Sequence, residues 1–373
     1  MKQRGWLLVF VALLAVAAFL MARSDRPKPP PRVSKVDFPR RATPQDTERR
    51  TRRLTLPPVL DADPEKRDPT PRDPLLVALP TDPRKSAFVF EVDDLKTSPI
   101  GQIWMDCLLA RENQRRDRLE DQLGLDFFED VERVAFSTER VAVLGLGADT
   151  PAIAPRGMTA TPHGDRGQIY TRDDEGRGPL IATWGDDMVL VSPDRASLEA
   201  ALDRLGGKTP PEKPLIPSEA SYGDIYGMLS PDDAADLLPP EQAELAARLR
   251  EAVSKVEIHV DASEDVALVA NVDGPDAESV SDLAKSLGAA LAVARAASSD
   301  EGDDRLAGLL DYASVRPRDG RFSLDLALPI DVLKTLGPCR KRDRPRDRAP
   351  EGEPEPEPDN EAPGPENEEP DQP

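Results

Sequence analysis

The sequence has few of the residues on which most catalytic and metal sites depend. Its 373 residues include only 2 cysteines and 2 histidines. Two cysteines cannot form a zinc site by themselves, and His163 and His259 are far from metal-ligand spacing. In an oxidising compartment Cys107 and Cys339 are a candidate disulfide that would close nearly the whole folded body; the alternative is two unrelated thiols. We predict no metal ligand and no cofactor.

A Ser-His-Asp or Cys-His site would have to use one of the two histidines. We predict that His163 lies in a flexible Pro- and Gly-rich loop over residues 149–167, and that His259 lies on the polar face of a strand. Both side chains are therefore expected to be exposed. The run Leu205-Gly206-Gly207-Lys208-Thr209 is similar to the end of a phosphate-binding loop, but Pro210 and Pro211 stand where a helix should begin. The sequence predicts no catalytic residue.

Aromatic residues are also scarce, at 4% of the chain, so the core must be built from Val, Leu, Ile and Ala. The net charge is −21, yet residues 1–53 carry 13 basic and 4 acidic side chains, which leaves residues 54–339 strongly acidic. An acidic body argues against a nucleic-acid partner, whose phosphates it would repel. We interpret the acidic run at 300–304 as a solvated loop, while the abundance of carboxylates keeps a carboxylate-based hydrolase open as an alternative.

One long apolar run is present, from Trp6 to Ala22, after a short tail at residues 1–5. As a helix, this run would rise about 26 Å, slightly less than the hydrocarbon core of a bilayer. Lys2 and Arg4 precede it, as they would in an anchor or in a signal peptide. Leu20 and Ala22 form a poor cleavage site, which favours a retained single-pass membrane anchor at residues 6–22 over a cleaved signal peptide.

The basic residues after this run and the position of the run near the start of the chain predict opposite topologies. Arg23, Arg26 and Lys28 follow it closely, and the positive-inside rule applied to them predicts a cytoplasmic body. An apolar segment this near the start, with basic residues before it, is typical of exported chains. We expect a cell-membrane protein whose body is extracytoplasmic (periplasmic). A protein secreted after signal cleavage and a cytoplasmic-facing adaptor are the alternatives.

Two segments have the composition of disordered chain. Residues 23–85 form a spacer in which 13 prolines fall between Pro27 and Pro80, and proline removes backbone donors. Residues 339–373 form a tail that is basic over 340–348 and then rich in Glu and Pro. Because residues 351–373 contain no Val, Ile, Leu or aromatic residue, they cannot bury a core. We predict that both segments are disordered.

The remaining chain is predicted to form two modules, residues 86–207 and 218–338, joined by a Pro-rich linker at 208–217. In both modules a strand, a helix, a strand pair, a connection, a second strand pair and a helix opened by proline follow one another. A helical stretch is expected from Asp94 to about Gln122 in the first module, and over 275–297 in the second. Short sequence matches suggest an internal duplication: Glu132-Arg133-Val134 with Ser254-Lys255-Val256, Arg140-Val141-Ala142-Val143 with Asp265-Val266-Ala267-Leu268, and Ser192-Pro193 with Leu328-Pro329.

Strict alternation in the second module predicts which side chains face solvent. In the strand over Lys255–Asp261, the odd-numbered residues are expected on the polar side, and in the strand over Phe322–Leu328, Ser323 and Asp325 are expected to face out. The sequence as a whole predicts an α+β fold: two similar modules of mainly antiparallel strands with packed helices, after an N-terminal transmembrane helix.

These features together predict a membrane-tethered extracytoplasmic binding or scaffold protein of the cell envelope, and not an enzyme. The expected partners are the membrane, through the N-terminal helix, and another envelope protein or polymer. The alternative is a carboxylate-based hydrolase that acts on an extracytoplasmic polymer.

Overall fold

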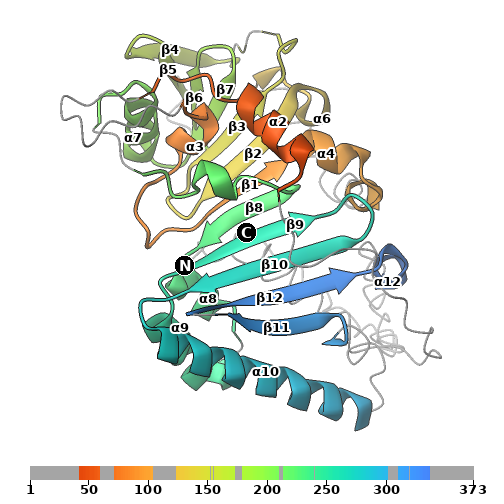
Figure 1. Cartoon of the computed structure of the whole chain (residues 1–373). Coiled ribbons are helices and arrows are strands. Elements are labelled where there is room, and N and C mark those ends of the chain that lie inside the picture. The colour runs from red at the N-terminus through yellow and green to blue at the C-terminus, as the bar shows by residue number, and fades with distance from the viewer. Residues whose placement is uncertain are drawn as a thin grey trace, which may run out of the picture. The chain divides into compact units, whose positions relative to one another are not determined.

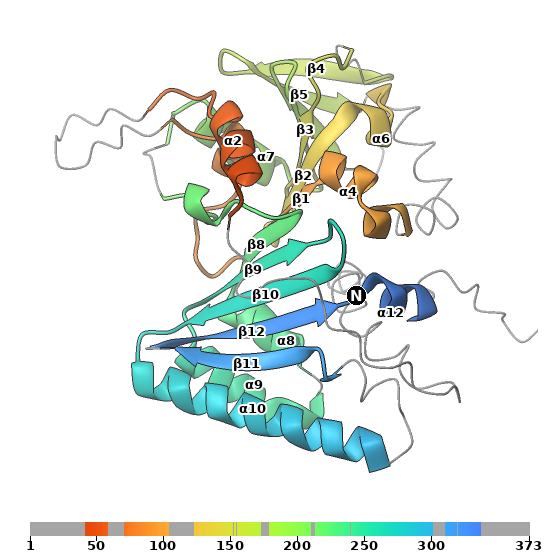
Figure 2. The ribbon, with the colours of Figure 1, turned by 45° about the vertical axis from the view of Figure 1, so that its right-hand side comes forward.

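The computed structural model describes residues 42–58, 71–103, 123–172 without 152 and 154, 179–209, 213–300 without 239, and 310–336 without 319. These residues form an α+β fold around an antiparallel sheet of 12 strands (Figures 1 and 2). In this part of the chain, no helix combines the length and the apolar character needed to span a bilayer. The predicted anchor at 6–22, the tail at 339–373, Cys107 and Cys339 lie outside the described residues.

The strands in chain order are β1 (Ala87–Glu91), β2 (Val131–Ser137), β3 (Ala142–Leu146), β4 (Met158–His163), β5 (Gly167–Arg172), β6 (Leu180–Trp184), β7 (Met188–Ser192), β8 (Ile225–Leu229), β9 (Lys255–Asp261), β10 (Val266–Asp273), β11 (Ala313–Arg318) and β12 (Arg321–Leu328). The α-helices are α2 (Pro44–Arg52), α3 (Pro74–Ala78), α4 (Val92–Thr97), α6 (Phe127–Asp130), α7 (Arg195–Leu205), α8 (Pro231–Asp236), α9 (Ala243–Ala252), α10 (Ala277–Asp300) and α12 (Ile330–Leu336). Two short 3-10 helices are η3 (Ser218–Ala220) and η4 (Pro240–Gln242).

The sheet has two halves that meet where β1 pairs with β8. In the first half the strands are ordered β1-β2-β3-β7-β6, with β5 and β4 added at the outer edge; in the second half the order is β8-β9-β10-β12-β11. In both halves the third strand pairs with the strand that comes last in the chain, β3 with β7 and β10 with β12. Figure 1 shows β1 and β8 side by side, with the first half above them and the second half below.

Several elements of the second half form where local sequence predicts them. Ser230 caps α8 by accepting a hydrogen bond from the backbone N of Asp233 at 3.1 Å, and Pro231 occupies the first helical position. The apolar stripe of α10 brings Val280 and Leu283 into a core with Val256, Ile258 and Phe322. The strands predicted over Lys255–Asp261 and Phe322–Leu328 are confirmed as β9 and β12.

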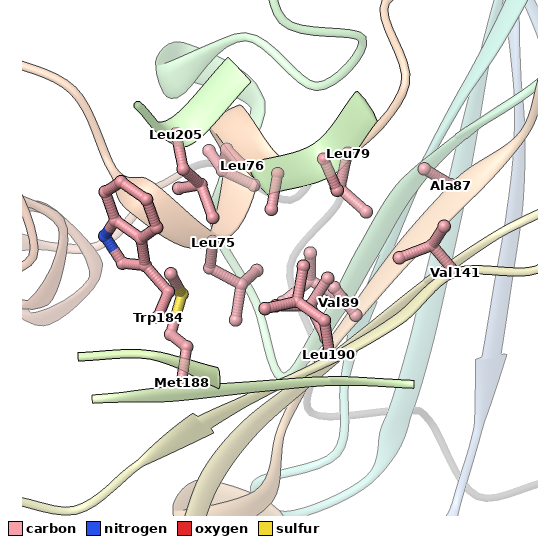
Figure 3. Packing of buried hydrophobic residues seen from close by; sticks show 14 of the residues in the cluster. Leu75, Leu76, Leu79, Ala87, Val89, Val141, Trp184, Met188, Leu190 and Leu205 are labelled. Carbon is pink, nitrogen blue, oxygen red and sulfur yellow. The ribbon is translucent and has the colours of Figure 1, made fainter. Parts of the chain in front are cut away.

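The core of the first half lies under α3 and α7. Figure 3 shows Leu75 of α3 between Trp184 and Met188 on one side and Val89 and Leu190 on the other. The side chain of Leu75 is 0% exposed. Because α3 belongs to the segment before the first module, the N-terminal segment is part of this core.

The prediction of a disordered spacer over 23–85 is wrong for α2 and α3. Thr43 and Asp46 form a reciprocal capping box at the start of α2, and Asp73 caps α3. Pro44 and Pro74 occupy the first position of these helices, where the missing N–H removes no hydrogen bond. Proline there starts a helix instead of preventing one.

Two other predictions in the first module are corrected. The expected loop at 149–167 contains β4 and the start of β5, whose register runs from Met158↔Arg172 to His163↔Gly167. The helix expected from Asp94 to Gln122 begins earlier, as α4 at Val92, and is interrupted at Ser98, where Pro99 disfavours helical backbone; the described residues 99–103 are helical again. Residues 104–122 lie outside the described residues.

Candidate functional site

Strand register gathers polar side chains on one face of the second half of the sheet. One row crosses the strands from Met228 on β8 through Glu257, Asn271 and Ser323 to Arg316 on β11. The neighbouring row runs through Tyr226, His259, Val269, Asp325 and Ser314. We call the following residues the polar face: Glu257, His259, Asn271, Arg316, Ser323 and Asp325.

The same side of the sheet is apolar in the first half. Val89 pairs with Tyr226, which places both on this side. From Val89 the row continues across the strands through Ala135, Val143, Leu190 and Ala182. All of these residues are buried in the core that α3 and α7 cover. The second half therefore carries Glu257, Asn271, Ser323 and Arg316 along a row where the first half carries a hydrophobic core.

The helices of the second half pack on the opposite side of the sheet. Residues of α8, α9 and α10 share a core with Val256 and Ile258, which alternate with the polar-face residues of β9. Val332 and Leu333 of α12 pack against Leu328, again on that opposite side. These helices therefore do not pack on the polar face.

His259 is 0% exposed, so the prediction of an exposed side chain is wrong. Its Nε2 atom lies 2.6 Å from Oε1 of Glu257, its Nδ1 atom lies 3.1 Å from the carbonyl oxygen of Tyr222, and its ring stacks on the Tyr222 ring at 3.7 Å. The hydrogen bond from His259 lowers the pKa of Glu257. Because a carbonyl oxygen can only accept, Nδ1 of His259 donates to Tyr222, which leaves Nε2 to share the short hydrogen bond with Glu257.

Ser323 and Asp325 are also buried, at 1% and 3% exposure, although alternation predicts that they face solvent. The Nε atom of Arg316 lies 2.9 Å from Oδ2 of Asp325, within ion-pair distance. Among the described residues, no hydrogen bond reaches either carboxylate oxygen of Asp325 or the hydroxyl oxygen of Ser323. Burying a carboxylate costs several kcal/mol unless hydrogen bonds and charge compensate for the lost water. Asp325 is therefore compensated by the charge of Arg316 alone, and Ser323 is a buried hydroxyl that receives no hydrogen bond from the described residues.

A second group of buried charges lies where the two halves and the N-terminal segment meet. Arg53 donates to both carboxylate oxygens of Glu91 at 2.7 and 2.6 Å, and Tyr226 donates its hydroxyl to Oε1 of Glu91 at 2.9 Å. Arg133 donates to Asp73 at 2.6 and 3.1 Å. Burial opposes the charge of Arg133, but Asp73 raises the pKa of its guanidinium. Each of these carboxylates faces a guanidinium at close range, so the group acts as a structural clamp.

His163 belongs to a separate polar contact in the first half. It lies on β4, where its Nε2 atom is 2.8 Å from Oδ1 of Asp203, and Lys208 Nζ lies 3.2 Å from the same oxygen. The hydrogen bond with His163 lowers the pKa of Asp203. The prediction of an exposed loop histidine is wrong, because the β4–β5 hairpin brings His163 against α7. This contact and the polar face lie in different halves of the sheet.

No known protein family, curated protein or solved structure matches the chain. Within the described ranges, no group of three or more His, Cys, Asp or Glu side chains is placed to hold a metal ion. The acidic run at 300–304 lies largely outside those ranges. The polar face was missed at the level of sequence because its members come from four strands. The alternating polar residues of β9 and β12 are the sequence signal that points to this face, but alternation alone predicts that these side chains face solvent.

Proposed function

We propose that this chain is a binding or scaffold protein of the cell envelope, tethered to a membrane by residues 6–22 with its body on the extracytoplasmic side. We propose further that the polar face is its binding surface. The observation that carries this proposal is the contrast between the two halves. On one side of a continuous sheet, a buried apolar row in the first half is replaced by Glu257, Asn271, Ser323 and Arg316 in the second.

The proposal includes a body of two similar modules, and the strand order supports it. α4 begins directly after β1, α8 begins one residue after β8, and each helix contains six residues. If α4 is aligned with α8, the strand pairing aligns Val134 on β2 with Val256 on β9. The short sequence matches suggest the same alignment. A duplicated module can keep the fold with one copy while the other acquires a polar surface.

The tether is shorter than the sequence suggests. α2 is bound to the body, because Arg53 just after it is paired with Glu91, and Asp46 accepts a hydrogen bond from the backbone N of Gly223 at 3.2 Å. Only residues 23–41 then remain between the proposed anchor and the described structure, and they can reach at most about 65 Å when fully extended. The body would therefore be held near the membrane surface.

A hydrolase is the second candidate, because Glu257 and Asp325 lie on the same face two strands apart. Their environments weigh against acid–base roles: Glu257 is hydrogen bonded to His259, and Asp325 lies beside Arg316. If the chain is a hydrolase, Glu257→Gln and Asp325→Asn should each abolish turnover of an envelope polymer without unfolding the protein. Equal turnover in these variants and the wild type excludes this site as the catalytic centre.

The proposed location can be tested with a tagged full-length chain and a variant that lacks residues 6–22. We expect the full-length chain in the membrane fraction and the variant in the soluble fraction. Protease added outside the cytoplasmic membrane should digest the body of the full-length chain. Recovery of the full-length chain, with its N-terminus intact, in the soluble fraction refutes the tether. A body that is protected from external protease refutes the extracytoplasmic location.

A further inference from the structure

We propose that α2 is a releasable strap, which opens about the Arg53–Glu91 pair and thereby lengthens the tether between the membrane and the body. α2 is the first described helix after the proposed anchor. The effect on tether length rests on the proposed function. The opening of α2 itself rests only on the contacts of the described residues.

α2 packs on the body without an apolar face. Its sequence, PQDTERRTR, contains no Val, Ile, Leu, Met or aromatic residue. Asp46 is its only buried residue, and none of residues 42–53 belongs to a hydrophobic core. Segments with few buried apolar contacts are the ones that open locally while the rest of a protein stays folded. α2 therefore has the composition of a segment that can detach by itself.

Polar contacts hold α2 in place. They are the pair of Arg49 with Asp94, the hydrogen bond from Arg50 to the carbonyl oxygen of Ser218 at 2.9 Å, and the hydrogen bond from the backbone N of Gly223 to Asp46 at 3.2 Å. The side chains of Arg49 and Asp94 are 19% and 26% exposed, so dissolved ions can screen their attraction. Burial raises the pKa of Asp94, although the charge of Arg49 lowers it. Pairing with Arg49 thus does not fully offset the water that this carboxylate loses.

The residues directly after α2 set the limit of the opening. Arg53 donates to both carboxylate oxygens of Glu91, which is 2% exposed. Leu56 follows in the core of the first half and forms a β-bridge with Arg72. These contacts are more buried than those of α2, so they stay closed when α2 detaches. The nine residues of α2 are too few for a stable isolated helix, and a released α2 would unfold.

Opening changes the reach of the tether. With α2 bound, residues 23–41 connect the proposed anchor to the body and reach at most about 65 Å. With α2 released and unfolded, residues 23–52 connect the two and reach at most about 100 Å. Conditions that weaken the ion pair of α2 would therefore let the body stand farther from the membrane.

The test is hydrogen–deuterium exchange of the full chain in detergent, read by mass spectrometry in ~0.1 M and ~1 M NaCl, between which the screening length falls from about 10 Å to about 3 Å. We expect the amides of α2 to exchange at least about threefold faster at the higher salt concentration. The internal reference is α7, which buries Leu198 and Leu202 in the core of the first half. Its amides should exchange more slowly than those of α2 and keep their rate.

Matched variants separate the ion pair of α2 from general charge. Asp94→Asn removes the charge that faces Arg49, so α2 should exchange about threefold to tenfold faster at low salt and should respond less to added salt. Asp93→Asn is the control, because Asp93 is adjacent, is 57% exposed and pairs with Lys96. This control should leave the exchange of α2 unchanged.

A second pair of variants keeps the test decisive if Asp94→Asn does not fold. Arg49→Gln removes the same ion pair from the side of α2 and should also accelerate its exchange. Arg52→Gln is its control, because Arg52 is 71% exposed and pairs with Glu48 within α2. Circular dichroism confirms that each variant is folded.

Three results would overturn the proposal. Exchange of α2 as slow as that of α7 at both salt concentrations would show that α2 opens only when the whole protein unfolds. A rate that does not respond to salt, or equal rates in Asp94→Asn and Asp93→Asn, would show that charge does not hold α2 in place. Membrane fractionation does not depend on these rates, so failure of the strap is distinguishable from failure of the tethered-protein proposal.

Discussion

Glu91 offers the sharpest test of how this fold is held together, because it joins the N-terminal segment to both halves of the sheet. Its side chain is 2% exposed and accepts two hydrogen bonds from Arg53 and one from Tyr226. Glu91→Gln keeps the size of the side chain and removes its charge. The guanidinium of Arg53 then loses its counter-ion.

The size of the effect follows from burial. Removing one partner of a fully buried ion pair costs about 3–5 kcal/mol. The Arg53 side chain is 22% exposed, so water can solvate part of the released charge. We therefore expect Glu91→Gln to lower the free energy of unfolding by about 2–3 kcal/mol, below the fully buried range.

The measurement is urea unfolding of the full chain in detergent, followed by circular dichroism. Glu48→Gln is the matched control. Glu48 makes the same kind of pair with Arg52 on α2, but both side chains are mostly exposed, and such pairs contribute about 0–1 kcal/mol. A loss in Glu91→Gln no larger than that in Glu48→Gln would refute the reasoning, because the clamp would then contribute no more than a surface pair.

Three further predictions concern other parts of the fold. The hydrogen bond from His259 lowers the pKa of Glu257 below its ordinary value of 4.5. The ionised carboxylate should therefore stabilise the fold above pH 4.5, and this stabilisation should be lost as the pH falls below 4.5. The unfolding midpoint of Glu257→Gln should vary less between about pH 3 and 7 than that of the wild type. Leu75→Ala should cost about 3–4 kcal/mol because it leaves a cavity under α3, and a cost below about 1 kcal/mol would contradict the packing. Gly223→Ala should cost about 1–3 kcal/mol, since Gly223 has φ +89° and a Cβ atom would lie 2.8 Å from the Val260 carbonyl oxygen; unchanged thermal stability would show that the turn can relax.

The sequence by itself determined several elements of the second half. Alternation predicts β9 and β12, an apolar stripe predicts α10, and a cap next to proline predicts α8; all of these signals depend on neighbours within a few residues. The α+β class and the antiparallel strands follow from the same local signals. The polar face did not follow, because its members come from different strands that only pairing brings together.

Only the tertiary structure decided which faces are buried and where the body begins. Alternation on β9 shows that Glu257 and His259 share a face, but it cannot show that the Tyr222 ring stacks on His259. Pro44 and Pro74 are equally compatible with a disordered spacer and with the first turn of a helix. Only the packing of residues such as Leu75 in the core distinguishes the two. Burial depends on contacts between segments far apart in the chain, and local sequence carries no record of those contacts.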